Sequence, residues 1–266
     1  MLKYLFLILV LGGCSNTEIS NDKKEHLLLK GINSYSNGDN QKALKYYEEI
    51  LKKDKNNELV LEEVGIINAK LENYDKARLA FEKVLEIDEN NIRVIQNLAL
   101  LEFKEQNYSR AIKVLKTLPK GKFRNQENYI LGYSYYKLKN YNQSFQNFQK
   151  IDKKTIVNDD ESLKIYLYIL SENLNSQEKY KELKELKKEE IDNRKSILLL
   201  SNAFQEEYND FNNSETILKR YLYKNNLEEE ILIELAKLYY RTKNKLEYNK
   251  IIKLLSKNYS YNLEYI

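Results

Sequence analysis

The sequence predicts an all-α fold, a solenoid of about seven helix pairs that follows an N-terminal signal segment. Two observations carry this prediction. The 266 residues include one Pro and only seven Gly, and both residue types interrupt helices, so their scarcity favours long, unbroken helices. Small and large residues also recur along the chain about every 34 residues, which is typical of stacked helix pairs.

The composition is that of a folded, non-fibrous protein. Hydrophobic residues make up 42% of the chain and charged residues 32%, which suits a globular or repeat protein better than a disordered one. The net charge of +4 is small and the two signs are interleaved, whereas a nucleic-acid surface concentrates basic residues on one face. The single cysteine excludes an intrachain disulfide framework.

Residues 1–13 have the pattern of a signal peptide. A positive charge at Lys3 precedes an apolar run over residues 4–11. This run is too short to span a bilayer, which needs about 20 apolar residues, but it fits the apolar core of a short signal peptide. The mature chain is therefore expected to begin after residue 13.

The end of this segment resembles the bacterial lipobox, in which Leu and two small residues precede Cys: Leu11-Gly12-Gly13-Cys14. The resemblance implies that the Cys14 thiol is lipidated with a diacylglyceryl group and that cleavage frees the amine for further acylation, for example with palmitate. Two or three acyl chains anchor a protein stably in a membrane. An ordinary secretory signal and an uncleaved anchor are the alternatives, although no Ala-x-Ala-like cleavage site is present.

The residues after the cysteine predict a location and a tether. Ser15, not Asp, follows the cysteine. This resembles the sorting pattern of outer-membrane lipoproteins and implies a location on the outer membrane, facing the periplasm, if the organism has two membranes. Residues 14–23 comprise the acylated cysteine and a polar stretch without apolar periodicity, which is expected to form a tether of at most ~30 Å.

From residue 24 onward, a small residue recurs in the second helix of each expected pair, followed four positions later by a large one. The first three small residues lie 34 positions apart and are Ala43, Ala77 and Ala111; the large residues are Tyr47, Phe81, Leu115 and, in the fourth unit, Phe148. A further position in the first helix of each pair lies 12 residues before the small residue and is occupied by Gly31, Gly65, Ala99 and Gly132, then by Asn202 and Ala236. Small residues allow two helices to approach closely, and the large residue fills the adjoining gap, so these positions predict the packing of each pair.

This pattern resembles the tetratricopeptide repeat, in which Leu-Gly-x2-Tyr and Ala-x3-Phe mark the two helices. The resemblance implies a right-handed α-solenoid, because each pair can bury its apolar face only against its neighbours. Two features depart from the family pattern: Trp is absent from the chain, and the Pro that usually ends a unit is missing after the first two units. The expected organisation is four clear units over residues 24–158, a degenerate helical unit over 159–194 and two further units over 195–266.

The sequence offers little for catalysis. His26 is the only histidine, and the only cysteine is in the lipobox, so no His/Cys metal cluster can form. The seven glycines are accounted for by the lipobox, helix contacts and turns, and no phosphate-binding glycine motif occurs. We therefore expect no enzyme activity, no cofactor and no metal, and an exposed surface position for His26.

Function is instead expected in the concave groove that the first helix of each unit lines in this architecture. In the fourth unit, three tyrosines spaced i, i+4, i+7 form one aromatic strip, since this spacing follows one face of a helix. Tyr is favoured at interfaces because it combines a large apolar ring with a hydroxyl group. The predicted partner-binding residues are Tyr129, Tyr133, Tyr136 and Lys137, together with Arg93, Phe103 and Lys104 on the preceding first helix. The alternative is that some of these tyrosines pack between units.

The sequence thus predicts a membrane-anchored scaffold or adaptor that binds protein or peptide partners in the cell envelope and assembles an envelope complex. Tyrosine rings also stack on sugars, so a groove that binds a glycan or peptidoglycan fragment is the alternative. No nucleic-acid partner is expected. The identity of the partner and the oligomeric state are left open, because repeat surfaces vary while the packing pattern stays fixed.

Overall fold

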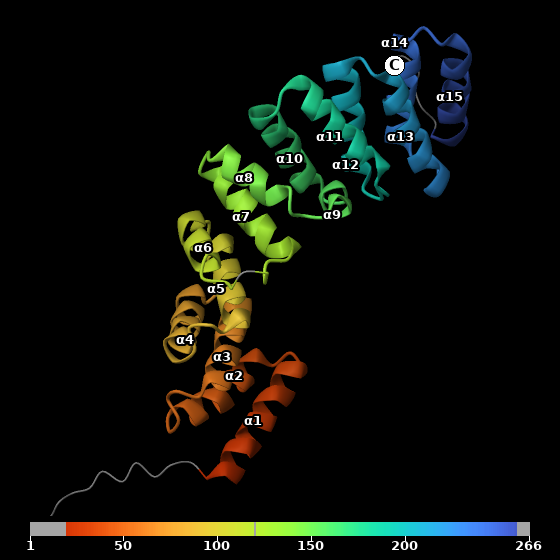
Figure 1. Ribbon diagram of the computed structural model, residues 1–266. Helices are drawn as coiled ribbons and strands as arrows, with labels where there is room; N and C mark the ends of the chain where they lie inside the picture. The colour runs from red at the N-terminus through yellow and green to blue at the C-terminus, as the bar shows by residue number, and fades with distance from the viewer. Residues whose placement is uncertain (1–19, 120, 260–266) are drawn as a thin grey trace, which may run out of the picture. The chain divides into compact units, whose positions relative to one another are not determined.

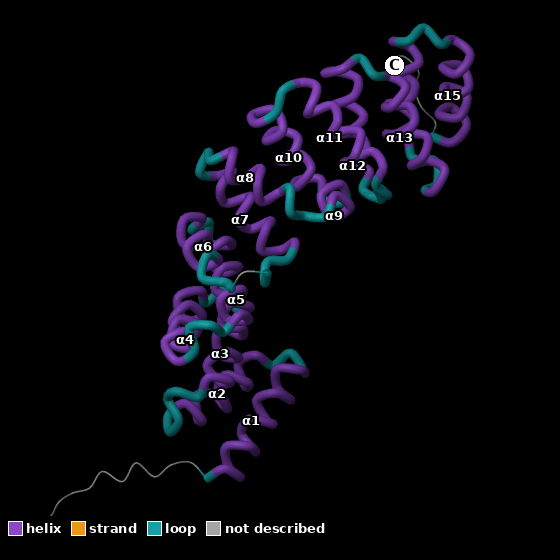
Figure 2. The backbone as a smooth tube through the Cα atoms, in the orientation of Figure 1, coloured by secondary structure: helices purple, strands orange, loops and turns teal. Residues whose placement is uncertain are grey.

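The computed structural model describes residues 20–119 and 121–259, and over these ranges the chain consists of helices joined by turns, with no strand (Figure 1). Figure 2 shows the same arrangement by secondary structure. The predicted signal peptide and Cys14 lie outside the described residues. The helices are α1 (Asn21–Ser36), α2 (Asn40–Leu51), α3 (Glu58–Lys70), α4 (Tyr74–Ile87), α5 (Ile92–Lys104), α6 (Tyr108–Leu115), α7 (Asn125–Lys137), α8 (Tyr141–Phe148), α9 (Lys153–Val157), α10 (Asp160–Asn173), α11 (Ser176–Lys188), α12 (Arg194–Asn202), α13 (Phe211–Lys224), α14 (Glu229–Arg241) and α15 (Lys245–Asn258), with a π-helical turn η1 (Ala203–Glu207) after α12.

The contacts divide the chain into two units. The first contains α1 to α5 together with Thr117–Pro119, and the second contains α6 to α15. Within the first unit, α1 packs on α2 and α3 on α4. Within the second, α7 packs on α8, α12 on α13 and α14 on α15, while α10 packs on α8, α9 and α12. The predicted all-α fold built from helix pairs is confirmed.

Each of three helix pairs is held by a glycine pressed against an aromatic ring. A Cβ atom added at Gly31 would lie 2.3 Å from the Tyr47 ring, and one at Gly65 would lie 2.4 Å from Phe81. At Gly132 the nearest atom would be in the Phe148 ring, at 2.6 Å. The three rings are buried. The small and large residues predicted from the 34-residue period therefore touch, and the aromatic partner leaves no room for a side chain.

The turns within the helix pairs share a left-handed residue. A positive φ angle occurs in six units, two positions after the first helix or, in the sixth unit, two positions after η1: at Gly38, Glu72, Gln106, Lys139, Asn209 and Lys243. Only one of the six is a glycine, although a side chain makes this backbone conformation unfavourable. The degenerate unit differs, since Leu174 after α10 is extended, with φ −119°.

Replacing Lys139 with Gly is expected to raise the free energy of unfolding by about 0.5–1 kcal/mol, because it removes the side chain from a left-handed residue. Gly38→Ala, at the equivalent turn, is expected to lower it by a similar amount. Urea unfolding followed by circular dichroism measures both changes. A loss of stability in Lys139→Gly would contradict this account of the turn.

The sixth helix pair corrects one expectation. Asn202 was expected at the small-residue contact, but the structure places Ser201 there, fully buried, with its hydroxyl 2.8 Å from Ser214 Oγ. Asn202 is exposed. The π-helical turn η1 takes up one more residue than an α-helical turn, so the two contact positions lie 13 residues apart instead of 12.

The degenerate segment contains a helix pair as expected, formed by α10 and α11. Its buried apolar side chains include Leu163, Tyr166, Leu170, Leu183 and Leu186. The short helix α9 precedes this pair and adds Ile156 and Val157 to the same core.

Candidate binding groove

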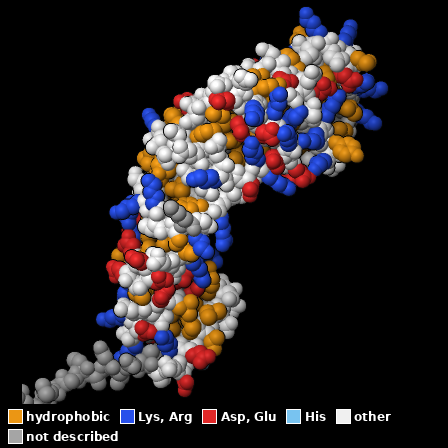
Figure 3. Space-filling view, viewed as in Figure 1, with side chains coloured by type: hydrophobic (Ala, Val, Ile, Leu, Met, Phe, Trp, Pro, Cys, Tyr) orange, Lys and Arg blue, Asp and Glu red, His pale blue; other side chains and the backbone are white. Residues whose placement is uncertain are grey.

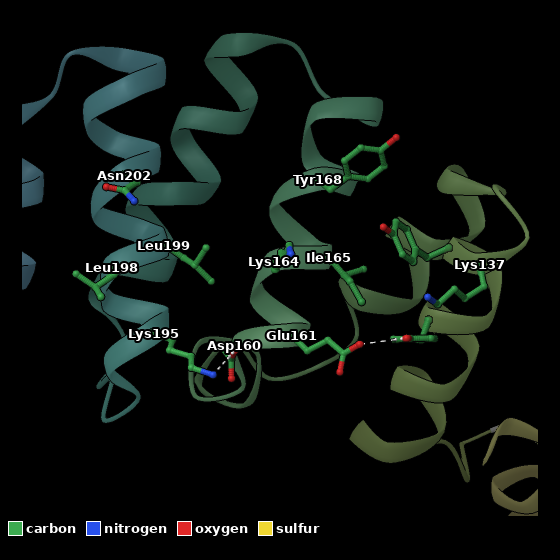
Figure 4. Close-up of a pocket in the computed structure, with 12 residues that line it drawn as sticks. Lys137, Asp160, Glu161, Lys164, Ile165, Tyr168, Lys195, Leu198, Leu199 and Asn202 are labelled. Atoms are coloured by element: carbon green, nitrogen blue, oxygen red, sulfur yellow. Dashed lines mark hydrogen bonds and ion pairs between the residues drawn. The ribbon is translucent and has the colours of Figure 1, made fainter. Parts of the chain in front are cut away.

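The second unit has a groove of about 790 Å³ between α7, α10 and α12. Figure 4 shows these three helices side by side, with the lining residues drawn as sticks. The first helix of three successive units thus lines the groove. Its lining residues are Tyr133, Tyr136, Lys137, Asp160, Glu161, Lys164, Ile165, Tyr168, Lys195, Leu198, Leu199 and Asn202.

One helical face repeats across the three helices. Each contributes residues at i, i+4 and i+7, which lie on one side of a helix because two turns span about seven residues. The three sets are Tyr129, Tyr133 and Tyr136 on α7, Glu161, Ile165 and Tyr168 on α10, and Lys195, Leu199 and Asn202 on α12. The groove therefore changes from aromatic on α7 to aliphatic on α12.

Tyrosine rings form a continuous wall at the α7 side. The ring centroid of Tyr136 lies 6.3 Å from that of Tyr133 and 5.7 Å from that of Tyr168. Tyr141, at the start of α8, lies 5.5 Å from Tyr168. These rings meet edge-on or tilted, which is the favoured geometry for aromatic pairs. Mutual packing holds the rings in place, and Tyr133, Tyr136 and Tyr168 also line the groove.

Polar contacts fix the orientation of Tyr133. Its hydroxyl donates to Glu161 Oε1 at 3.1 Å, and Lys137 Nζ lies 5.1 Å from the ring centroid. Burial, together with the hydrogen bond to Glu161, raises the pKa of Tyr133. The interaction with Tyr133 raises the pKa of Lys137, so Lys137 is a cation at neutral pH.

The predicted residues of α7 differ in their placement. Tyr133, Tyr136 and Lys137 line the groove, as the strip predicts. Tyr129 is half-buried and is absent from the lining; its ring packs edge-on against Phe148, with 6.1 Å between centroids. Burial is the main cause that raises the pKa of Tyr129. The ring of Tyr129 thus packs against the second helix of its own pair.

The other three predicted residues belong to the first unit, on α5. Arg93 forms ion pairs with Glu62 and Glu63 of α3, at 2.5 and 3.1 Å. Phe103 is half-buried. Lys104 is exposed at the edge of a smaller pocket of about 250 Å³ between α3, α4 and α5. The structure therefore gives Arg93 a partner within its own unit.

The sequence prediction missed the contributions of α10 and α12. Tyr168 is 43% exposed and faces Tyr136 across the groove, while Lys164, Lys195 and Leu199 extend the lining. A signal for them exists, because the i, i+4, i+7 set of α7 recurs 32 residues later on α10 and 34 residues after that on α12. It was hidden by the weak repeat pattern of the degenerate unit.

The described residues offer no candidate metal site. They contain no group of three or more His, Cys, Asp or Glu residues that could hold a metal ion. His26 is exposed on α1, as expected, and does not belong to the groove. Within the same residues, no helix is both long enough and apolar enough to cross a membrane.

Comparison with known proteins identifies the fold. Residues 70–151 match the family model of the anaphase-promoting complex, cyclosome, subunit 3. A solved structure of MamA, 41-end, from Desulfovibrio magneticus RS-1 aligns with a TM-score of 0.55 and 19% identity over 64% of this chain and 96% of that one. Together with the helix pairs that recur every 34 residues, these matches decide the fold. The chain is a tetratricopeptide repeat protein by fold.

Other solved structures align with more of this tetratricopeptide repeat chain. A second MamA structure covers 71% of it and 97% of its own length, with 17% identity and a TM-score of 0.54. A tetratricopeptide repeat protein from Parabacteroides merdae ATCC 43184 covers 89% of this chain and 80% of its own, with 18% identity and a TM-score of 0.49. No curated protein sequence matches the chain.

Proposed function

We propose that this tetratricopeptide repeat protein is a lipid-anchored scaffold of the cell envelope that binds a protein or peptide partner in the groove of its second unit. The observation that carries the proposal is the groove itself. It combines tyrosine rings, aliphatic side chains and a few charged groups on three adjacent helices. Such a combination of rigid aromatic anchors and polar groups is typical of protein-binding surfaces.

The packing of the rings favours a peptide over a glycan. A sugar stacks on an open ring face, but the tyrosines of the groove meet one another edge-on or tilted, and Lys137 lies over the Tyr133 ring. The apolar part of the lining continues on α12 as Leu198 and Leu199, which suits aliphatic or aromatic side chains of a peptide.

Truncating the groove tyrosines tests the proposal, because the truncated variants should capture less of the partner. Tyr133→Ala with Tyr136→Ala is expected to weaken capture of the partner at least about tenfold, since buried aromatic anchors contribute 2 kcal/mol or more at interfaces. Tyr168→Ala, which removes a more exposed ring, is a second variant with less effect on packing. Co-purification from intact envelopes measures capture, and circular dichroism checks folding.

The matched control is Tyr223→Ala, because Tyr223 is 92% exposed on α13 and does not line the groove. It is expected to leave capture unchanged. Equal capture by the groove variants and the wild type would show that the tyrosines only pack. Retention of a sugar with no protein in the wild type would favour the glycan alternative.

The membrane anchor is supported by the Leu11-Gly12-Gly13-Cys14 pattern. Cells fed radiolabelled palmitate are expected to label the wild-type protein and to leave Cys14→Ala unlabelled. The variant should also leave the membrane fraction, because two or three acyl chains are what hold the protein there. Equal labelling of both proteins would exclude lipidation at Cys14.

A further inference from the structure

We propose that the groove of the second unit selects an acidic peptide segment that also carries aliphatic or aromatic side chains. This inference rests on the proposed function, since it specifies the chemistry of the partner that the groove binds. Three features carry it: a row of three lysines of which two have no carboxylate partner among the described residues, acidic groups that already have partners within the protein, and an apolar floor.

The lysines come from each of the three helices. Lys137 on α7, Lys164 on α10 and Lys195 on α12 all line the groove, and Figure 4 shows Lys164 between the other two. Lys137 contacts tyrosine rings, and neither it nor Lys164 has a carboxylate partner among the described residues. Two exposed cations are thus available to a ligand.

The acidic groups of the lining are occupied within the protein. Glu161 accepts the hydroxyl hydrogen of Tyr133, and Asp160 forms an ion pair with Lys195 at 3.7 Å. Both interactions are drawn in Figure 4. Since three lysines face two carboxylates in the lining, the groove has a net positive charge.

The floor between these charges is apolar. Ile165 is buried at its base, and Leu198 and Leu199 continue it on α12. Adjacent packed helices lie about 8–10 Å apart, so three helices span roughly 16–20 Å, or about six residues of extended peptide. A segment of this length can place apolar side chains on the floor and carboxylates beside Lys137 and Lys164.

Selection from a peptide library tests the proposed chemistry. Random displayed peptides of roughly 12 residues, long enough to cross the groove, are panned against the full chain. We expect the enriched peptides to combine Asp or Glu with Leu, Ile, Phe or Tyr. A synthetic peptide with the enriched sequence should bind about tenfold or more weakly to Lys137→Glu with Lys164→Glu, because each attraction becomes a repulsion. The affinity of this peptide for the wild-type chain should also fall in 1 M salt, because the Debye length is then only about 3 Å and charge–charge attraction is screened.

The control reverses the charge of two lysines that lie outside the groove. Lys113 on α6 and Lys253 on α15 are exposed and do not line it, so Lys113→Glu with Lys253→Glu changes the net charge equally and should leave binding unchanged. Equal losses in both double variants would show that net charge, not the groove, attracts the peptide, and would overturn the inference.

Two further outcomes separate this inference from the proposed function. Enrichment of neutral or basic peptides whose binding is lost in Tyr133→Ala with Tyr136→Ala would overturn the acidic preference and leave peptide binding by the groove intact. If no enriched peptide depends on these tyrosines for binding, both the acidic preference and peptide binding by the groove are contradicted.

Discussion

Arg78→Met is expected to lower the free energy of unfolding by about 3–5 kcal/mol, the cost of leaving a buried charge without its partner. Arg78 on α4 donates from Nε to Glu102 of α5 at 2.8 Å, and Glu102 is completely buried. It also donates to Asp75 at 2.8 Å and pairs with Glu105. The Arg78 side chain is only 13% exposed and that of Glu102 is not exposed at all, so water has little access to the Glu102 carboxylate.

Chemical unfolding followed by circular dichroism measures this change, and two further variants identify its cause. Arg78→Met with Glu102→Gln is expected to recover part of the lost stability, because no buried charge then remains. Arg194→Met, whose side chain is 45% exposed beside Glu228 and Glu230, should cost at most about 1 kcal/mol. A loss in Arg78→Met no larger than that in Arg194→Met would contradict the importance of the buried network.

Gly65→Ala is expected to lower the free energy of unfolding by about 2–3 kcal/mol through overpacking. The added methyl group would lie 2.4 Å from the Phe81 ring, and both Gly65 and the ring are buried in the first unit. The ring borders the small pocket between α3, α4 and α5, but it has to shift to admit the methyl group, and in a close-packed interior such a shift costs stability.

A second substitution is expected to relieve the clash. At the same 16-residue spacing the chain has Ala99 with Leu115 and Ala236 with Ile252, whereas glycine accompanies Tyr47, Phe81 and Phe148. Gly65→Ala with Phe81→Leu should therefore be more stable than the sum of the two single changes predicts, by about 0.5–3 kcal/mol. If the losses of unfolding free energy in the two single variants simply add up in the double variant, the two positions do not interact.

The sequence predicts the helix pairs well because their packing depends on pairs of residues at fixed spacing. Gly65 and Phe81 are an example. Their close approach needs a glycine, so the residue types at these two positions mark the contact in the sequence. The sixth pair shows where this reasoning fails. The π-helical turn between Ser201 and Ser214 contains one residue more than an α-helical turn and shifts the contact by one position. The residue types in this segment do not predict the π-helical turn.

The groove was only partly predictable for a different reason. The strip of Tyr133 and Tyr136 stands out because three tyrosines share one helical face, but the lining on α10 and α12 consists of unlike residues such as Lys164 and Leu199. Residues that line a groove do not have to fit a fixed neighbour, so their type need not repeat from unit to unit. Only their i, i+4, i+7 positions on the first helices recur. Figure 3 shows the same mixture, with hydrophobic, basic and acidic side chains interspersed over the visible face.

The central claim is that the partner binds in the groove of the second unit, and crosslinking in living cells tests it most directly. A photoreactive phenylalanine derivative replaces Tyr168 in the groove or, in a parallel strain, Tyr223 on α13, which is 92% exposed. We predict one discrete protein adduct from position 168, its loss when Tyr133→Ala and Tyr136→Ala are added, and no such adduct from position 223. The same adducts from both positions, or none from position 168, would contradict the claim.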